Sequence, residues 1–209
     1  MVLPIRSKTS TSIRHRADPD RRFSQIPRTL AVLVGSLRSQ SINHTVAKAL
    51  AKVAEGGLAF DFVEIGDLPL YNDDLWHEGR GPEAVERMRA QIAAADGVLL
   101  VTPEYNRAVP GVLGNALDWG SRPWGKSVWT GKPAGCCGVS GGAIGTAAAQ
   151  VHLKAQMVTL GMVVMGQPEF YLKFEADKYA PDGTVTDDSL RGFLKGYTDA
   201  LAAHIARLS

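Results

Sequence analysis

From residue 29 onward, unbroken apolar runs alternate with stretches in which apolar residues recur at helical spacing. Short runs rich in Val and Leu are typical of strands buried on both faces of a parallel sheet. They occur at residues 29–34, 58–65, 97–102, 134–139 and 162–165. Helical spacing predicts helices at residues 43–54, 82–95, 112–119, after 140–142 as far as about 160, and 188–208.

This alternation predicts an α/β protein, in which a five-stranded parallel sheet lies between two layers of helices as a three-layer sandwich. Five such units suit the strand order 2-1-3-4-5, whose ligand site lies at the switch point beside the first strand. The loops after the first, third and fourth strands then converge on one crevice. Residues 29–209 are expected to form this single domain.

The loop after the first predicted strand is crowded with short polar side chains. It offers one guanidinium and several small donors: Ser36, Arg38, Ser39, Ser41 and Asn43. A helix N-terminus with such donors favours an anion, and Arg38 can pair with two phosphate oxygens at once. We therefore predict a phosphate-group site here, although Ser and Asn are also common helix caps. The loop has neither the P-loop sequence nor G-x-G-x-x-G.

Two further loops at predicted strand ends suit a flat ligand. Residues 103–111 are braced by Pro103 and Pro110, so their backbone N–H groups can press against a heteroaromatic ring while Tyr105 packs nearby. Residues 140–142 have the sequence Ser-Gly-Gly, and the two glycines carry no side chain where the edge of such a ring would approach. Either loop, taken alone, is equally consistent with a plain tight turn.

Composition and charge narrow the class of protein. The chain has 209 residues, of which 45% are hydrophobic, and no apolar run approaches the ~20 residues of a membrane span. The formal charge of +2 divides into +5 on residues 1–28 and −3 on the remainder, so we predict no nucleic-acid binding by the domain. Residues 1–28 are expected to be a disordered basic extension. Two adjacent cysteines in an apolar run suggest buried thiols in a cytoplasmic protein.

Four motifs, in this order along the chain, resemble the NAD(P)H-dependent FMN reductase family. They are Gly35-Ser-Leu-Arg38-x-x-Ser41-x-Asn43, Leu68-Pro-Leu-Tyr71, Thr102-Pro-Glu-Tyr-Asn106 and Val109-Pro-Gly-x-x-x-Asn115-Ala-x-Asp118-Trp. The resemblance spans about residues 29–175, and the family includes bacterial quinone, chromate and ferric reductase flavoproteins. It implies a flavodoxin-like fold, non-covalent FMN, NAD(P)H as co-substrate, and a homodimer or homotetramer with sites near subunit interfaces.

The resemblance also implies roles for individual residues. One set would hold the FMN phosphate: Ser36, Arg38, Ser41, Ile42 and Asn43. A second set would line the isoalloxazine ring and the ribityl chain, and would close the far side: Pro103, Glu104, Tyr105, Asn106, Arg107, Ser140 and Gly141. Asp74 resembles a position that reaches the flavin of a neighbouring subunit. Many relatives carry Tyr where this chain has Arg107 and Val151.

The expected chemistry belongs to the cofactor, because FMN accepts hydride while the protein supplies orientation and electrostatics. We expect a ping-pong cycle in which NAD(P)H reduces FMN and leaves. A quinone, free flavin or metal chelate such as chromate or ferric ion is then reduced on the same face. No side-chain acid or nucleophile is required. Arg107 is the candidate contact for the phosphates of NAD(P)H, and a solvent-facing loop arginine is the alternative.

Two other classes of function remain open on the sequence. Residues 138–142 match the G-x-S-x-G pattern of a hydrolase nucleophile elbow built on Ser140, which Asp177 or Asp182 and His204 could complete. A non-enzymatic, flavodoxin-type electron carrier would use the same cofactor without NAD(P)H. The five histidines show no ligand spacing with each other or with the cysteines, so we predict no metal site.

Overall fold

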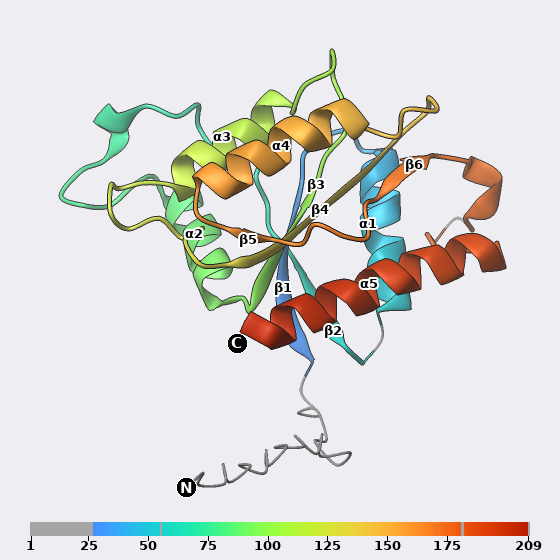
Figure 1. The fold of residues 1–209 in the computed structure, drawn as a ribbon. Coiled ribbons are helices and arrows are strands. Elements are labelled where there is room, and N and C mark those ends of the chain that lie inside the picture. Colours follow the sequence, from blue (N-terminus) through green and yellow to red (C-terminus); the bar gives the residue numbers. More distant parts are fainter. Residues whose placement is uncertain (1–26, 55, 181, 209) are drawn as a thin grey trace, which may run out of the picture.

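The computed structural model describes residues 27–54, 56–180 and 182–208, and a parallel sheet runs through its centre (Figure 1). The strands are β1 (Arg28–Val34), β2 (Leu58–Phe62), β3 (Gly97–Val101), β4 (Pro133–Ser140), β5 (Val163–Val164) and β6 (Tyr171–Lys173). The helices are α1 (Ile42–Val53), α2 (Glu83–Ala94), α3 (Gly111–Gly120), α4 (Ala147–Thr159) and α5 (Asp188–Leu208), with short 3-10 helices η1 (Asp73–Leu75) and η2 (Ala176–Lys178).

The strand order is β2-β1-β3-β4-β5, and β6 pairs with β4 outside this path. Every pairing of these strands is parallel, and β1 lies between β2 and β3, with Leu30 opposite Phe60 of β2 and Gly97 of β3. This order confirms the predicted 2-1-3-4-5 arrangement and places the carboxyl ends of β1, β3 and β4 side by side. The fold is therefore flavodoxin-like α/β.

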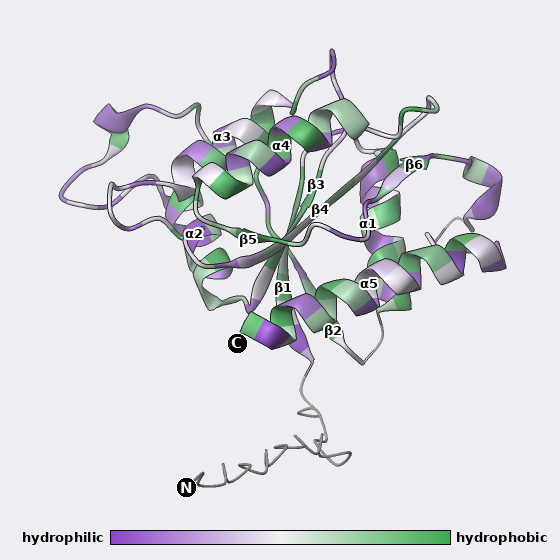
Figure 2. Ribbon diagram, in the orientation of Figure 1, coloured by the Kyte–Doolittle hydropathy of each residue, from purple (hydrophilic) through white to green (hydrophobic). Residues whose placement is uncertain are grey.

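Successive residues of each strand enter opposite hydrophobic cores. In β1, Leu30 and Val32 pack with α1 and α5, whereas Ala31 and Leu33 pack with α2, α3 and α4. Figure 2 shows hydrophobic colouring along the central strands and mixed colouring around the helices. Burial on both faces explains why the strands read as unbroken apolar runs rather than as an alternation.

Several predicted boundaries require correction. β2 ends at Phe62 rather than at residue 65, and β5 contains two residues rather than four. α4 begins at Ala147, because residues 141–146 form bends and turns that end with Thr146 in the left-handed region, at φ +66°. β6 was missed because its three residues carry no apolar run. It pairs with Gly138–Ser140, the end of β4 that extends past β3.

The predicted extension at residues 1–28 lies almost wholly outside the described residues. Arg28, which we assigned to it, is the first residue of β1, and its N–H donates to the carbonyl of Gly57. The predicted last helix, residues 188–208, agrees with α5 at both ends. In the part of the chain that the structure describes, no helix is both long enough and apolar enough to cross a membrane.

Candidate functional site

The carboxyl ends of β1, β3 and β4 enclose a hollow of about 160 Å³. Its lining consists of Ser36, Arg38, Ser41, Ile42, Asn43, Pro103, Glu104, Tyr105, Val139, Ser140 and Gly141. Three loops that are far apart in the sequence therefore meet, as predicted. Of the predicted site residues, only Asn106, Arg107 and Asp74 are not part of this lining. Val139 was missed, although its place as the last apolar residue before Ser140 could have indicated it.

The N-terminus of α1 forms one end of the hollow. Ser41 is the N-cap, and its Oγ accepts a hydrogen bond from the N–H of His44 at 3.2 Å. The first N–H groups of a helix have no intrahelical partner, so those of Ile42 and Asn43 remain available to an anion. Ser36 is buried beside them. This donor set suits a phosphate group.

Arg38 supplies the positive charge at this end. Within residues 27–54, 56–180 and 182–208, no carboxylate pairs with its guanidinium. Burial, followed by the nearby charge of Lys48, lowers the pKa of His44 below its ordinary value, so its imidazole is neutral at pH 7. Of these two side chains, Arg38 is therefore the one whose positive charge is available to bind a phosphate.

The side chain of Asn43 was expected to bind the phosphate, but in the structure it binds the backbone of β4. Its Nδ2 donates to the carbonyl of Val139 at 3.1 Å, and its Oδ1 accepts from the N–H of Val139 at 3.0 Å. Both polar atoms of the buried amide are therefore engaged in joining α1 to β4. Any contact of Asn43 with a phosphate is left to its backbone N–H.

The loop after β3 forms the second wall as a tight hairpin turn. Tyr105 and Ala108 exchange two backbone hydrogen bonds, of 3.3 and 3.0 Å, around Asn106 and Arg107. Both turn residues have positive φ, +53° and +65°, which is uncommon outside glycine and asparagine. The Tyr105 hydroxyl donates to Ser36 Oγ at 3.5 Å, at the edge of the hydrogen-bond range. This contact links the loops after β1 and β3.

Among the residues that the structure describes, Glu104 is the only carboxylate in the lining of the hollow. Its Oε2 accepts a hydrogen bond from the N–H of Ala149 in α4 at 3.1 Å. Its Oε1 lies 3.2 Å from Nη1 of Arg107, the residue that we expected to contact NAD(P)H. Arg107 therefore lies beside the hollow without being part of its lining.

The geometry rules out the hydrolase built on Ser140. The Ser140 hydroxyl donates to the carbonyl of Gly142 at 2.9 Å. His204 instead contacts the carbonyl of Val163, which lies opposite Pro133 at the start of β4. Seven strand steps of ~3.3 Å put that end of β4 on the order of 20 Å from Ser140. Asp182 is ion-paired with Lys52, so no Ser-His-Asp arrangement forms.

Asp74 lies in η1, on a loop between β2 and α2 that projects from the body of the molecule (Figure 1). The base of the loop is anchored, because Trp119 Nε1 donates to the carbonyl of Pro69 at 2.7 Å and Tyr71 packs edge-on against Trp119. Asp74 itself is exposed. It is not part of the hollow of its own chain.

Neither cysteine suits nucleophilic or metal chemistry. Burial raises the pKa of Cys136 to about 11 and raises that of Cys137 well above its ordinary value, so both remain thiols at neutral pH. Across the described residues, no group of three or more His, Cys, Asp or Glu side chains could hold a metal ion. Charge in the hollow thus comes from Arg38 and Glu104.

Comparison with known proteins places the chain in a family. The family model described as NADPH-dependent FMN reductase matches residues 28–177. A 2-hydroxy-1,4-benzoquinone reductase of a Burkholderia species is 49% identical over 176 residues, 84% of this chain and 95% of that protein. A quinone reductase of Pseudomonas putida is 47% identical over 177 residues, 85% and 94% of the two chains.

A solved structure extends the comparison to three dimensions. FerB, a flavoenzyme NAD(P)H:(acceptor) oxidoreductase from Paracoccus denitrificans, superposes with a TM-score of 0.83 at 49% identity. The match covers 86% of this chain and 98% of that one. With a family model matching most of the chain and relatives near half identity, the protein is an oxidoreductase that belongs to the NADPH-dependent FMN reductase family.

Proposed function

We propose that this protein binds FMN in the hollow and uses NAD(P)H to reduce quinones. The observation that carries the proposal is the donor set at one end of the hollow. There the first N–H groups of α1 and the hydroxyls of Ser36 and Ser41 meet the guanidinium of Arg38, with which no carboxylate of the described residues pairs. An anionic, monosubstituted phosphate is the ligand that such a set favours.

The remaining lining residues suit the rest of the cofactor. Pro103, Glu104 and Tyr105 would lie along the ring and the ribityl chain, and Ser140 with Gly141 would close the opposite side. A Cβ at Gly141 would meet no atom within 4 Å, so the backbone there is open to close approach. When bound, FMN supplies hydride acceptance and electron transfer. The protein's own task is to hold the ring and to admit two substrates in turn.

We propose that NAD(P)H and the acceptor use the same open side of the hollow in a ping-pong cycle. Arg107, exposed beside the hollow, would contact the phosphates of the nucleotide. Quinones are the first acceptors to test, because both relatives described above are named as quinone reductases. Free flavins, chromate and ferric chelates are further candidate acceptors. Because NAD(P)H is a reductant of the cytoplasm, we also propose a cytoplasmic location.

We further propose that the protein acts as a homodimer or homotetramer. Asp74, on its projecting loop, would then reach the hollow of a neighbouring subunit. Helix α4 supports self-association because it carries an apolar stripe at heptad spacing: Ala148, Val151, Ala155 and Val158. Val151 and Val158 are 59% and 64% exposed, which is unusual for valines on one helix face.

The first experiment records the absorbance spectrum of the purified protein and titrates it anaerobically with NADH and NADPH. We expect a yellow protein whose flavin bleaches, and Arg38→Ala should weaken FMN binding at least tenfold because it removes a bidentate phosphate contact. Arg87→Ala, at an exposed ion pair with Asp67, is the control and should leave FMN binding unchanged. A flavin that stays oxidised would favour the electron carrier, and a colourless protein that refuses FMN would refute the proposal.

A further inference from the structure

One carboxylate, that of Glu104, joins the loop after β3 to helix α4. Its side chain is only 9% exposed, although the loop that carries it lies at the surface. One oxygen accepts from the N–H of Ala149 at 3.1 Å, and the other lies 3.2 Å from Arg107 Nη1. The loop after β3 and the N-terminus of α4 are therefore connected through a single side chain.

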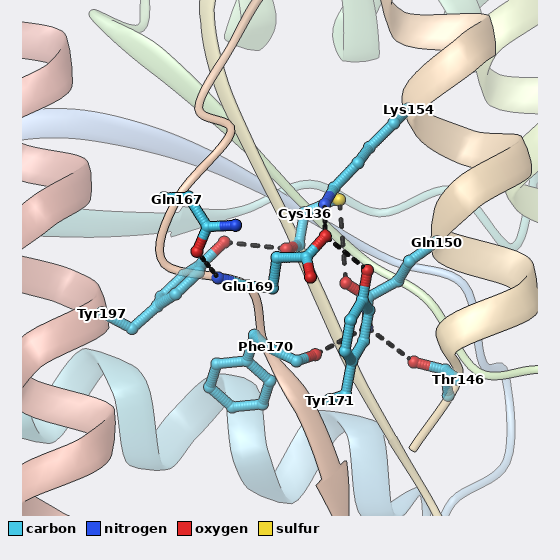
Figure 3. A network of polar contacts seen from close by, with 9 residues as sticks. All are labelled: Cys136, Thr146, Gln150, Lys154, Gln167, Glu169, Phe170, Tyr171 and Tyr197. Atoms are coloured by element: carbon cyan, nitrogen blue, oxygen red, sulfur yellow. Dashed lines mark hydrogen bonds and ion pairs between the residues drawn. The ribbon is translucent and has the colours of Figure 1, made fainter. Parts of the chain in front are cut away.

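Helix α4 depends on Glu104 because it lacks a cap of its own. Thr146 stands at the N-cap position with φ +66°, and its side chain makes no capping bond. Its Oγ1 instead accepts a hydrogen bond from Nε2 of Gln150 at 2.9 Å, and the same nitrogen donates to the carbonyl of Phe170 (Figure 3). A carboxylate is favoured beside the free N–H groups of a helix N-terminus. The position of Glu104 is thus fixed independently of Arg107.

Arg107, by contrast, is fixed by little else. It stands at the tip of the hairpin turn in a backbone conformation that is strained for arginine, with φ +65°. Its side chain is 65% exposed, and Glu104 is its one ion-pair partner among the described residues. Without that partner, a side chain with several rotatable bonds would sample many rotamers beside the hollow.

We propose that Glu104 is a positioning residue that holds the Arg107 guanidinium ready for the phosphates of NAD(P)H; this rests on the function proposed above. Glu104 engages one nitrogen of the guanidinium, so donors on its other nitrogens stay free for phosphate oxygens. Ordering the side chain before the nucleotide arrives removes part of the entropy cost of binding. Glu104 therefore affects nucleotide affinity through Arg107.

The direction in which one substitution changes the Kd for the nucleotide separates this role from simple electrostatics. Glu104→Gln keeps a carbonyl oxygen that can accept from the N–H of Ala149, but it removes the charge that holds Arg107. Loss of a negative charge near an anionic ligand would by itself tighten binding. Positioning predicts the opposite, a three- to tenfold higher Kd for NADH and NADPH, measured from the concentration dependence of flavin bleaching in anaerobic stopped flow.

A double-mutant cycle on the FMN-loaded protein provides the test. Arg107→Ala should raise the Kd at least as much as E104Q, and the double variant should be no weaker than R107A alone. Asp199→Asn, which breaks an exposed ion pair with Lys195 on α5, is the matched control and should leave the Kd unchanged. Additive effects, or an unchanged or tighter Kd in E104Q, would overturn the proposal.

Hydrogen exchange tests the anchoring of Glu104 without any turnover. The Ala149 N–H should exchange faster in Glu104→Ala and at the wild-type rate in R107A, because only the first change removes the cap of α4. Equal exchange in wild type and E104A would contradict the anchoring.

If the wild-type flavin is not reduced by either nucleotide, the proposed function fails and this proposal fails with it. If it is reduced and E104Q binds normally, only the role of Glu104 is wrong.

Discussion

The side chain of Asn43 joins two elements beneath the hollow, and its loss should be costly. Asn43→Ala would leave both the N–H and the carbonyl of Val139 without the partners they have now, in a buried place. Unsatisfied buried groups cost ~1–3 kcal/mol each, so for two of them we expect a loss of about 2–6 kcal/mol in the free energy of unfolding, measured by urea denaturation. Asn72→Ala, at an exposed cap of η1, is the control and should cost about 1 kcal/mol or less. A similar loss in both variants would contradict the assigned role.

Asn43 and Glu104 also mark the limit of sequence reasoning at the scale of single residues. The family resemblance implied that both belong to the site, and both line the hollow. It could not predict that their polar atoms bind Val139 and Ala149, because these partners lie 96 and 45 residues away in the chain. Such contacts depend on which elements the fold brings together, which residue type alone does not encode.

At the scale of elements, the apolar stripe of α4 leads to a prediction about assembly. Two α4 helices packed antiparallel about a twofold axis near residue 153 would place each stripe valine opposite an alanine. The small alanines let the two helices approach closely. The pairing of valine with alanine is self-complementary, as a twofold interface requires. Val151→Glu with Val158→Glu should therefore lower the oligomer mass by half or more, measured by size-exclusion chromatography with light scattering.

The control for this prediction lies on the same helix. Gln156→Glu adds a charge to α4 at an exposed position outside the stripe and should leave the mass unchanged. If the double valine variant keeps the wild-type mass, another surface holds the subunits together. An unfolded double variant is recognised by circular dichroism, in which case Val151→Glu alone carries the test.

Element boundaries were predicted best where burial imposes a pattern. β1, β3 and α5 were located to within one residue, because strands buried on both faces and a long amphipathic helix leave clear apolar periodicity. The start of α4 was placed too early, because its first turn is capped by Glu104 rather than by a local residue. β6 escaped prediction because its pairing with β4, and not its composition, makes it a strand.

For the whole molecule, the strand order followed from the alternation of strands and helices, and the order in turn predicted where the loops converge. The convergence places an anion site, a hairpin turn and a glycine-containing loop around one hollow. In a single chain three predicted site residues are not part of the lining of that hollow, and one of them, Asp74, lies on a separate loop. The molecule as a whole therefore poses the question of whether one subunit completes the site of another.

Mixing two variants that are each defective in one part of the site answers that question, when activity is assayed at an FMN concentration that loads the wild-type protein but not Arg38→Ala. Arg38→Ala weakens the phosphate contact in its own hollow but carries an intact Asp74, whereas Asp74→Ala carries an intact hollow and cannot complete that of its neighbour. If sites are shared, a hybrid dimer contains one site with both intact parts. Refolding the two variants together should then restore about a quarter of wild-type quinone reductase activity, because half of the dimers are hybrids with one good site of two. Activity of the mixture equal to the mean of the separately refolded variants would show that Asp74 does not act across subunits.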